Sequence, residues 1–241
     1  MKKNILENKN CLITGATGGL GQEIAKQLLA NNCNLFLTAK TEKRLKKLKN
    51  ELETYNHNKC KISYHSGNLS NLNHIKKIIS KVRKDLGSID ILINCAGVFM
   101  SKSISQSTLD DFQKVYDVNI RTPFMFCKEF SKDMIKKRWG RIVNIGSSSS
   151  YSGFKNGSIY CSSKHAILGL SRTLFNELKS YNVRSFCISP GSIKSKMGKL
   201  SKDQDFNTFL DPSDIAKYIE FIIKFDKDLI SEEIRLNRIK L

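Results

Sequence analysis

Short apolar runs alternate with segments of helical spacing along all 241 residues, and this alternation constrains the fold more than any other feature. The apolar runs are too short for helices, whereas the segments between them repeat apolar residues every three or four positions. Strict alternation with short connections predicts a doubly wound parallel sheet with helices on both faces. We expect about seven strands, at residues 11–14, 35–37, 61–65, 89–93, 141–145, 183–188 and 229–236.

The helices should cover the segments between these strands. No repeat and no Pro-rich linker interrupts the alternation, so residues 1–241 are expected to form a single domain. Ligands of such sheets bind beyond the carboxyl ends of the strands, which makes residues 194–210 a candidate substrate loop. The expected helices are residues 20–29, a Lys-rich helix after Thr41, a helix around residues 75–82, residues 112–137 with a break near Pro123, residues 159–180, and one opened by Asp211-Pro212.

The net charge of +19 raises the question of a nucleic-acid partner. The basic residues are spread over both halves of the chain, and no basic arm or aromatic-interleaved basic motif is present. Lysine and asparagine are both abundant, and a base bias of the genome towards A-rich codons suffices to explain that. We therefore expect no specific nucleic-acid function.

Apolar stretches and cysteines indicate the compartment. The most apolar stretch, residues 89–100, is broken by Asp90, Asn94 and Gly97 and falls short of a membrane span. Residues 1–9 start with two lysines but carry no apolar core typical of a signal peptide. The seven cysteines are scattered without a CxxC pair, which favours a reducing environment over a zinc site or a disulfide framework. The expectation is a cytoplasmic protein without a membrane segment.

A glycine-rich turn follows the first expected strand and opens the first helix. Glycine allows a sharp turn and a close approach of the backbone to a pyrophosphate, while the helix N-terminus offers free N–H groups. At the first strand–helix junction of an alternating chain, this turn predicts a dinucleotide site. Its residues are Thr14, Gly15, Ala16, Thr17, Gly18, Gly19, Leu20 and Gly21.

The residues after the second strand bear on the choice of dinucleotide. An acidic residue there would bind the ribose 2′-hydroxyl of NAD, but Thr38-Ala39-Lys40 contains no carboxylate. Lys40 can instead face a 2′-phosphate. We therefore expect NADP, with NAD as the alternative.

A tyrosine and a lysine four positions apart lie on one face of a helix, where the ammonium can lower the pKa of the phenol. Such a phenol can donate a proton to a carbonyl oxygen or take one from an alcohol. The chain contains three such pairs, Tyr55/Lys59, Tyr151/Lys155 and Tyr160/Lys164. Only the last is expected to open a helix directly after a strand, with Ser147 at the end of that strand.

These motifs together resemble the short-chain dehydrogenase/reductase family from about residue 10 to residue 193. The family has a Rossmann-type sheet and transfers hydride between a nicotinamide cofactor and a carbonyl or alcohol. The matching motifs are residues 14–21 for TGxxxGxG, Asn94-Cys95-Ala96-Gly97 for NNAG, Asn119 for the proton-relay asparagine, Ser147 thirteen residues before Tyr160, residues 160–164 for YxxxK, and Pro190-Gly191-Ser192-Ile193 for the PG motif.

The resemblance implies roles for these residues. Tyr160 is the general acid/base, Lys164 lowers its pKa and holds the nicotinamide ribose, Ser147 binds the substrate oxygen, and Asn119 keeps a water in the proton path. Asn68-Leu69 replaces the Asp-Val that usually holds adenine. The implied cofactor residues are Thr14, Gly15, Thr17, Gly18, Gly19, Leu20, Gly21, Lys40, Asn68, Leu69, Asn94, Ala96, Gly97, Tyr160, Lys164, Pro190, Gly191 and Ile193.

Within the family, the chain is most similar to 3-oxoacyl-carrier-protein reductases. The implied substrate is a small-molecule or carrier-linked carbonyl compound, and the implied assembly is a homodimer or homotetramer built from residues 112–137 and 159–180. The segments around Phe99, Phe154 and residues 194–209 should frame the pocket, because they follow strands. The lysines of these segments suggest a substrate with an acidic handle; they are Lys155, Lys194, Lys196, Lys199 and Lys202. Two alternatives remain open at this point: an enzyme that modifies sugar nucleotides, and a redox sensor that binds NADP without chemistry.

Overall fold

The computed structural model describes residues 4–201 and 204–239, which form one seven-stranded parallel sheet of order β3-β2-β1-β4-β5-β6-β7. The doubly wound sheet predicted from the alternation is thereby confirmed. The strands are β1 (Asn10–Thr14), β2 (Asn34–Ala39), β3 (Ile62–Ser66), β4 (Ile91–Asn94), β5 (Gly140–Ile145), β6 (Val183–Pro190) and β7 (Glu233–Leu236).

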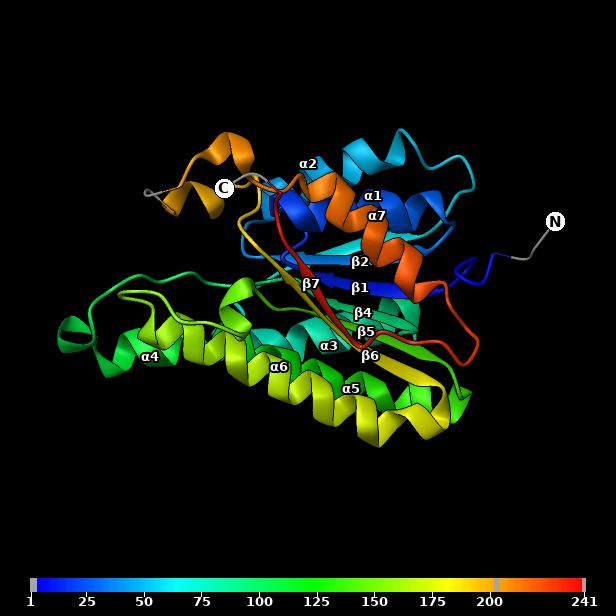
Figure 1. Ribbon diagram of the computed structural model, residues 1–241. Coiled ribbons are helices and arrows are strands. Elements are labelled where there is room, and N and C mark those ends of the chain that lie inside the picture. The colour runs from blue at the N-terminus through cyan, green and yellow to red at the C-terminus, as the bar shows by residue number, and fades with distance from the viewer. Residues whose placement is uncertain (1–3, 202–203, 240–241) are drawn as a thin grey trace.

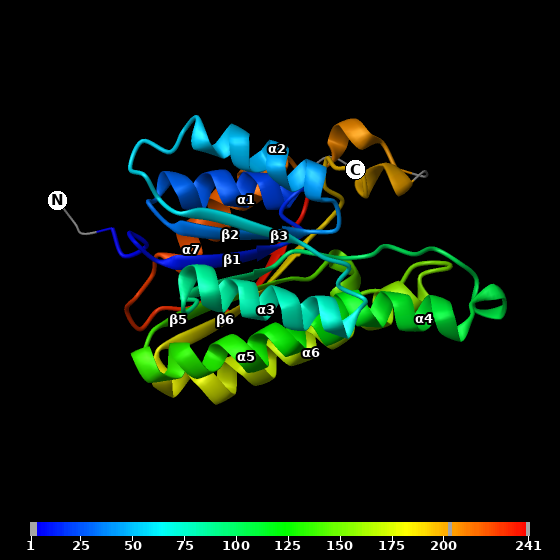
Figure 2. The ribbon, with the colours of Figure 1, turned by 180° about the vertical axis from the view of Figure 1, so that it is seen from behind.

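Helices cover both faces of the sheet, as Figures 1 and 2 show. Helices α1, α2 and α7 lie on one face, and α3, α5 and α6 lie on the other, with α4 extending beyond the sheet. The helices are α1 (Gly19–Ala30), α2 (Glu42–Glu53), α3 (Leu72–Leu86), α4 (Leu109–Tyr116), α5 (Thr122–Lys137), α6 (Ser158–Leu178) and α7 (Pro212–Ile223).

The strands are apolar because both of their faces are buried. In β1, Cys11 and Ile13 pack into the core beneath α1 and α7, whereas Leu12 packs into the core on the opposite face. Successive side chains of a strand point to opposite faces, so a strand between two helical layers needs apolar residues at every position. This explains the continuous apolar runs in the sequence.

The long helical segment at residues 109–137 is interrupted before its proline. A turn of π-helix at Asp117–Arg121 separates α4 from α5, and Pro123 lies in the first turn of α5. The π turn leads directly into α5, where the Thr122 N–H donates to the carbonyl of Asp117. Pro123 has no N–H with which to continue this series of hydrogen bonds. The break expected near Pro123 is therefore present, but the wide π turn produces it.

All strands are parallel, so their carboxyl ends share one edge of the sheet. The order of the strands reverses between β1 and β4, where Thr14 pairs with Asn94. At such a reversal the connecting helices leave to opposite faces and open a crevice. The sheet thus places the segments after β1, β4, β5 and β6 around one site.

Two kinds of structure are not found in the described part of the chain. None of its helices has the length and apolar character required to traverse a bilayer. No group of three or more His, Cys, Asp or Glu side chains is arranged to hold a metal ion within residues 4–201 and 204–239.

Candidate active site

A cleft of about 1070 Å³ lies at the carboxyl edge of the sheet, at the predicted crevice. It is bounded by the β1–α1 turn, the segments after β4 and β5, the start of α6 and the chain after β6. Residues far apart in the sequence therefore share one cavity. The predicted site residues that line it are Gly15, Gly18, Gly19, Leu20, Gly21, Gly97, Ser147, Tyr160, Lys164, Pro190, Gly191 and Ile193.

The β1–α1 turn is built for close backbone approach. Gly15 has φ +64°, and a Cβ on it would lie 2.8 Å from the backbone of Ala96. A Cβ on Gly21 would overlap the carbonyl of Gly15. Helix α1 has no side-chain cap and no acidic residue in its first turn. The turn is thus a glycine cradle with helix N–H groups facing the cleft, which suits the pyrophosphate of a dinucleotide.

The side chain of Thr14, at the end of β1, connects the glycine cradle to the segment after β4. Its hydroxyl donates to the carbonyl of Ile93 at 3.3 Å and accepts from the N–H groups of Cys95 and Ala96 at 3.0 and 3.1 Å. The side chain is buried and does not line the cleft. Thr14 therefore joins the ends of β1 and β4, and holds the cradle against the segment after β4.

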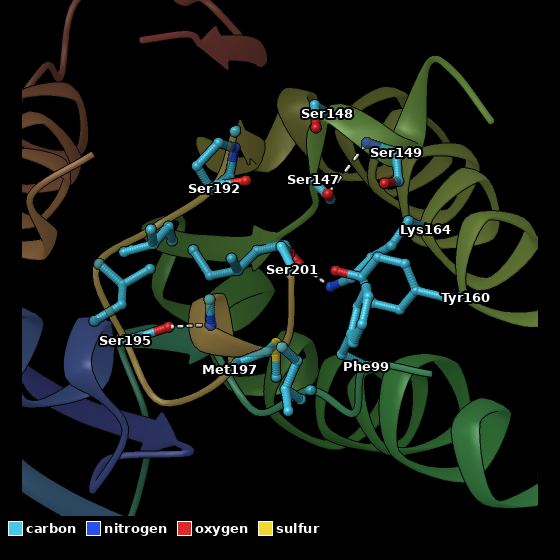
Figure 3. Close-up of a pocket in the computed structure, with 18 of the residues that line it drawn as sticks. Phe99, Ser147, Ser148, Ser149, Tyr160, Lys164, Ser192, Ser195, Met197 and Ser201 are labelled. Atoms are coloured by element: carbon cyan, nitrogen blue, oxygen red, sulfur yellow. Dashed lines mark hydrogen bonds between the residues drawn. The ribbon is translucent and has the colours of Figure 1, made fainter. Parts of the chain in front are cut away.

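Tyr160 and Lys164 lie in the first two turns of α6, and their side chains converge on Ser147 after β5 (Figure 3). The Lys164 Nζ donates to the carbonyl of Ile145 at 2.9 Å and lies 5.8 Å from the centre of the Tyr160 ring. The hydroxyl oxygen of Ser147 accepts from the N–H of Ser149 at 3.1 Å, so its hydrogen remains available for a substrate oxygen.

Asn119 lies in the π turn between α4 and α5. Its Oδ1 accepts from the N–H of Val98 at 2.8 Å, and its Nδ2 donates to the carbonyl of Val98 and to the hydroxyl of Ser163 at 3.1 and 3.0 Å. The side chain is buried and fully hydrogen-bonded. It locks the segment after β4 to α6, and places the π turn beside Lys164.

The other two Tyr–Lys pairs lack this arrangement. The Tyr151 hydroxyl donates to Glu233 Oε2 at 3.2 Å, and Lys155 lies in a loop. Tyr55 and Lys59 lie in the connection between α2 and β3, away from the cleft. Among the described residues, Tyr160/Lys164 is the pair that shares a helix face at the cleft.

A sequence model that describes the short chain dehydrogenases matches residues 9–205. The chain belongs to the short-chain dehydrogenase/reductase family. It is 33% identical over 224 residues to the 3-oxoacyl-[acyl-carrier-protein] reductase FabG of Rickettsia typhi, covering 89% of this chain and 88% of that protein. The resemblance read from the motifs is confirmed.

Solved structures of the family share the fold. An alcohol dehydrogenase from Thermococcus sibiricus, complexed with 5-hydroxy-NADP, superposes with a TM-score of 0.87 at 26% identity, covering 98% of each chain. ElxO with NADP bound superposes with a TM-score of 0.83 at 27% identity, covering 95% of this chain and 97% of that chain. The Rossmann-type architecture of the family thus extends over nearly the whole chain.

Burial dominates the electrostatics of Tyr160 and Lys164. It raises the pKa of Tyr160 to about 12, and the hydroxyl of Ser147 partly opposes this shift. Burial also lowers the pKa of Lys164 to about 8. Both shifts have one cause, because a low-dielectric site disfavours the charged form of either group. The phenol is therefore protonated at neutral pH. The expectation that Lys164 lowers its pKa was wrong, because burial outweighs the one contact that opposes it.

Several predicted cofactor residues do not line the cleft. Lys40 is exposed and outside it, and Asn94 is buried, donating to Asn144 Oδ1 at 2.8 Å. Asn68 accepts from Ser70 through its Oδ1, and Leu69 packs in the core. Thr17 and Ala96 contribute backbone to the cradle without lining the cleft. For these residues, contact with a cofactor remains a prediction.

Arg44 was missed by the sequence analysis. It lies in the first turn of α2, lines the cleft beside Gly18, and donates through Nη2 to the carbonyl of Thr17. In a helix with many lysines, the sequence contains no signal that separates this arginine from its neighbours. The Arg44 side chain points towards the cleft because α2 packs against the β1–α1 turn, and the sequence does not show this packing.

Proposed function

We propose that this chain is an oxidoreductase that interconverts a carbonyl and a secondary alcohol, with NADPH as its preferred cofactor. The observation that supports this most strongly is the convergence of the Tyr160 phenol, the Lys164 ammonium and the Ser147 hydroxyl in a cleft that also contains a glycine cradle. Family membership and the intact catalytic residues both favour this function over a binding module without chemistry.

The cleft fits a nicotinamide dinucleotide. Gly15 and Gly21 leave space that a Cβ would fill, and the first turn of α1 offers N–H groups at the same place. Pro190, Gly191 and Ile193 line the opposite end, where the family's PG motif meets the nicotinamide. When bound, the cofactor supplies or accepts the hydride, and the protein supplies orientation and the proton.

In the reductive direction, the Tyr160 hydroxyl donates its proton to the carbonyl oxygen of the substrate, while Ser147 donates a hydrogen bond to the same oxygen. The Lys164 ammonium then faces the phenolate that remains and stabilises it. Lys164 is held by the carbonyl of Ile145, so its position does not depend on the substrate. In the oxidative direction the phenolate takes the proton of the alcohol.

The pH profile tests the contact between Ser147 and Tyr160. In a Ser147→Ala variant the pKa of Tyr160 should rise further, because the hydroxyl that opposes the burial shift is lost. Alcohol oxidation needs the deprotonated phenol, so its rise with pH should move to higher pH, and kcat should fall by about 100-fold or more. Profiles of both directions measure this. An unchanged alkaline profile of oxidation would contradict the assignment.

Arg44 is proposed to bind the 2′-phosphate that distinguishes NADPH from NADH, in place of the predicted Lys40. An Arg44→Gln variant should raise the Kd of NADPH by about tenfold and leave that of NADH nearly unchanged, because a charge-assisted contact is lost. Titration of the purified protein with each cofactor measures both constants. Lys40→Gln is the matched control, and a larger loss in this control would assign the phosphate to Lys40 instead.

A 3-oxoacyl thioester is the substrate that the relatives favour. The similarity to FabG covers 89% of this chain, including the whole catalytic group. Turnover of acetoacetyl thioesters, followed by the absorbance of NADPH, tests this proposal. A sugar-nucleotide substrate is the alternative, and the same assay with nucleotide-linked sugars compares the two.

We further propose a homodimer or homotetramer. A shallow apolar groove across α4, α5 and α6 is lined by Phe112, Tyr116, Phe124 and Leu170, and Phe124 is half exposed. A second apolar stripe contains Tyr218 and Phe221 on α7 and Phe225 just after the helix ends. Exposed apolar patches of this kind mark protein interfaces. Sedimentation equilibrium measures the assembly, and a monomer at micromolar concentration would contradict it.

A cytoplasmic location is proposed from the cysteines. All seven are free thiols, and five of them are buried. Free buried thiols are typical of a reducing compartment. Localisation of the tagged full chain in its native cell tests this, and a periplasmic or extracellular signal would contradict it.

A further inference from the structure

The cleft has an aromatic wall beside the catalytic phenol. Phe99 follows β4 and packs edge-on against Tyr160, with ring centres 4.9 Å apart. Phe154, from the loop before α6, stacks at an interplanar angle of 16° to Phe99 and lies 6.3 Å from Tyr160. Both phenylalanines line the cleft, and Phe154 is 42% exposed. A group attached to the reacting carbon would therefore meet flat apolar surfaces.

The two loops that carry this wall are fixed to each other. The N–H of Lys102 donates to the carbonyl of Asn156 at 2.7 Å, which joins the segment after β4 to the loop before α6. A Cβ on Gly157 would lie 2.8 Å from the Phe154 ring, so the ring rests directly on the start of α6. The wall is thus a built part of the site.

A further wall comes from the segment after β6, where Figure 3 shows Met197. Met197 and Leu200 line the cleft there and are 39% and 56% exposed. The Ser195 hydroxyl accepts from the N–H of Gly198 at 3.0 Å and holds the turn that presents them. The substrate end of the cleft therefore has apolar sides.

The charged residues of the cleft are all cations in the part of the chain that the structure describes. Arg44 lies at the nucleotide end, and Lys164 belongs to the catalytic group. Lys155 and Lys196 remain, each next in sequence to a wall residue, Phe154 and Met197. Within residues 4–201 and 204–239, neither lysine forms an ion pair, and no carboxylate lines the cleft. We call Lys155 and Lys196 the basic rim. Lys155 adjoins the aromatic wall, and Lys196 belongs to the segment after β6 that passes beside Gly19 before it reaches Met197. Lys194 and Lys199 do not line the cleft, and Lys202 lies outside the described residues.

We propose that the site selects a carbonyl substrate with an apolar group next to the carbonyl and an anionic group further out. Phe99 and Phe154 would pack against the apolar group, and the basic rim of Lys155 and Lys196 would attract the anion. A cleft lined by one sign of charge focuses its field on the ligand and raises its local concentration. This inference rests on the proposed function, because it takes the Tyr160 end of the cleft as the reacting end.

The test compares 4-acetylbenzoate with its neutral methyl ester. Both have the same aryl ketone, and only the first has a charge. Calorimetry with the NADP-loaded protein should show that the acid binds about tenfold more tightly than the ester at low salt. At high salt the ratio of the two dissociation constants should approach one. In the Lys155→Gln/Lys196→Gln double variant the preference should disappear, while the ester binds as before.

Lys199→Gln is the matched control. Lys199 belongs to the same segment but lies over the Phe206 ring and does not line the cleft. This variant should keep the preference for the acid. A Phe154→Ala variant should weaken binding of both probes by about tenfold, because it removes contact with the shared aryl group. Equal binding of acid and ester to the wild type, or an equal loss in the control variant, would overturn the inference.

A second pair of probes separates two sources of the anion. Acetoacetyl-pantetheine and acetoacetyl-4′-phosphopantetheine differ only in a distant phosphate. If the protein prefers the phosphorylated member, and the double variant loses this preference, the basic rim binds the phosphate of a carrier arm. If a preference is seen only between 4-acetylbenzoate and its ester, the rim binds a small anionic ketone. If the acid binds with the expected preference but no NADPH is oxidised, the proposed function is contradicted, whereas the inference about the basic rim is supported. Turnover of the ester without a preference would contradict the rim alone.

Discussion

A Tyr160→Phe variant should lose ketone reduction by a factor of about 10²–10⁴ in kcat while it still binds NADPH. Phenylalanine preserves the ring and its packing against Phe99, so the variant removes the proton donor and little else. Steady-state turnover and cofactor titration measure the two effects separately.

Tyr151→Phe is the control for this experiment. Tyr151 also has a lysine four residues later, but its hydroxyl is bonded to Glu233 and it does not line the cleft. Its replacement should leave kcat within about twofold of the wild type, as expected for a change outside the reacting group. Equal activity of wild type and Tyr160→Phe would contradict the catalytic role. If neither the wild type nor the Tyr160→Phe variant reduces a ketone while both still bind NADPH, the redox-sensor alternative is favoured.

An Arg141→Met variant should be destabilised by about 3–5 kcal/mol in its free energy of unfolding. Arg141 is fully buried in β5, beneath the end of α7. Its guanidinium donates to the carbonyls of Ile223 and Phe225 at 3.0 Å each, and pairs with Asp226 at 2.6 Å. Methionine would fill the volume but leave these acceptors buried without donors. Urea unfolding measures the loss.

Arg184→Met is the control for Arg141. Arg184 lies on the neighbouring strand β6 and donates to the carbonyls of Leu229 and Lys227, but it is more exposed, so water can replace its donors. Its loss should cost about 1 kcal/mol or less. Similar costs for the two variants would contradict the view that Arg141 holds α7 onto the sheet.

The sequence was sufficient to predict the order of elements because the period of the apolar residues is a local property. The runs in β1, β4 and β5 are continuous since helices cover both faces. The π turn at Asp117–Arg121 was not predictable, because α4 before it is short and buries only Val115, so no apolar stripe precedes the turn to show a shift in phase. Thr41 lies at the N-cap of α2 as expected, yet its side chain makes no capping hydrogen bond.

The grouping of Tyr160, Lys164 and Ser147 was predictable, because it depends on strand order and helical spacing alone. Tyr160 and Lys164 share a face of α6, and Ser147 follows β5, so strand order and helical spacing bring them together. The surroundings were harder to predict because they depend on side-chain direction. Lys40 and Arg44 are both basic and close in sequence, and only the packing of α2 turns Arg44 towards the cradle.

The aromatic wall shows the same limit. Phe99 and Phe154 were expected near the pocket, since both follow strands. They pack on each other and on Tyr160 where the hydrogen bond between Lys102 and Asn156 joins two loops more than fifty residues apart. The spacing of apolar residues in the sequence does not predict a contact between two loops.

The most direct measurement of the central claim follows the transfer of deuterium from C4-deuterated NADPH to a panel of aryl and 3-oxoacyl ketones. The account predicts NADPH oxidation with deuterium on the carbinol carbon of the product, and a loss of transfer in Tyr160→Phe. Tight binding of NADPH with no transfer to any ketone of the panel would contradict it.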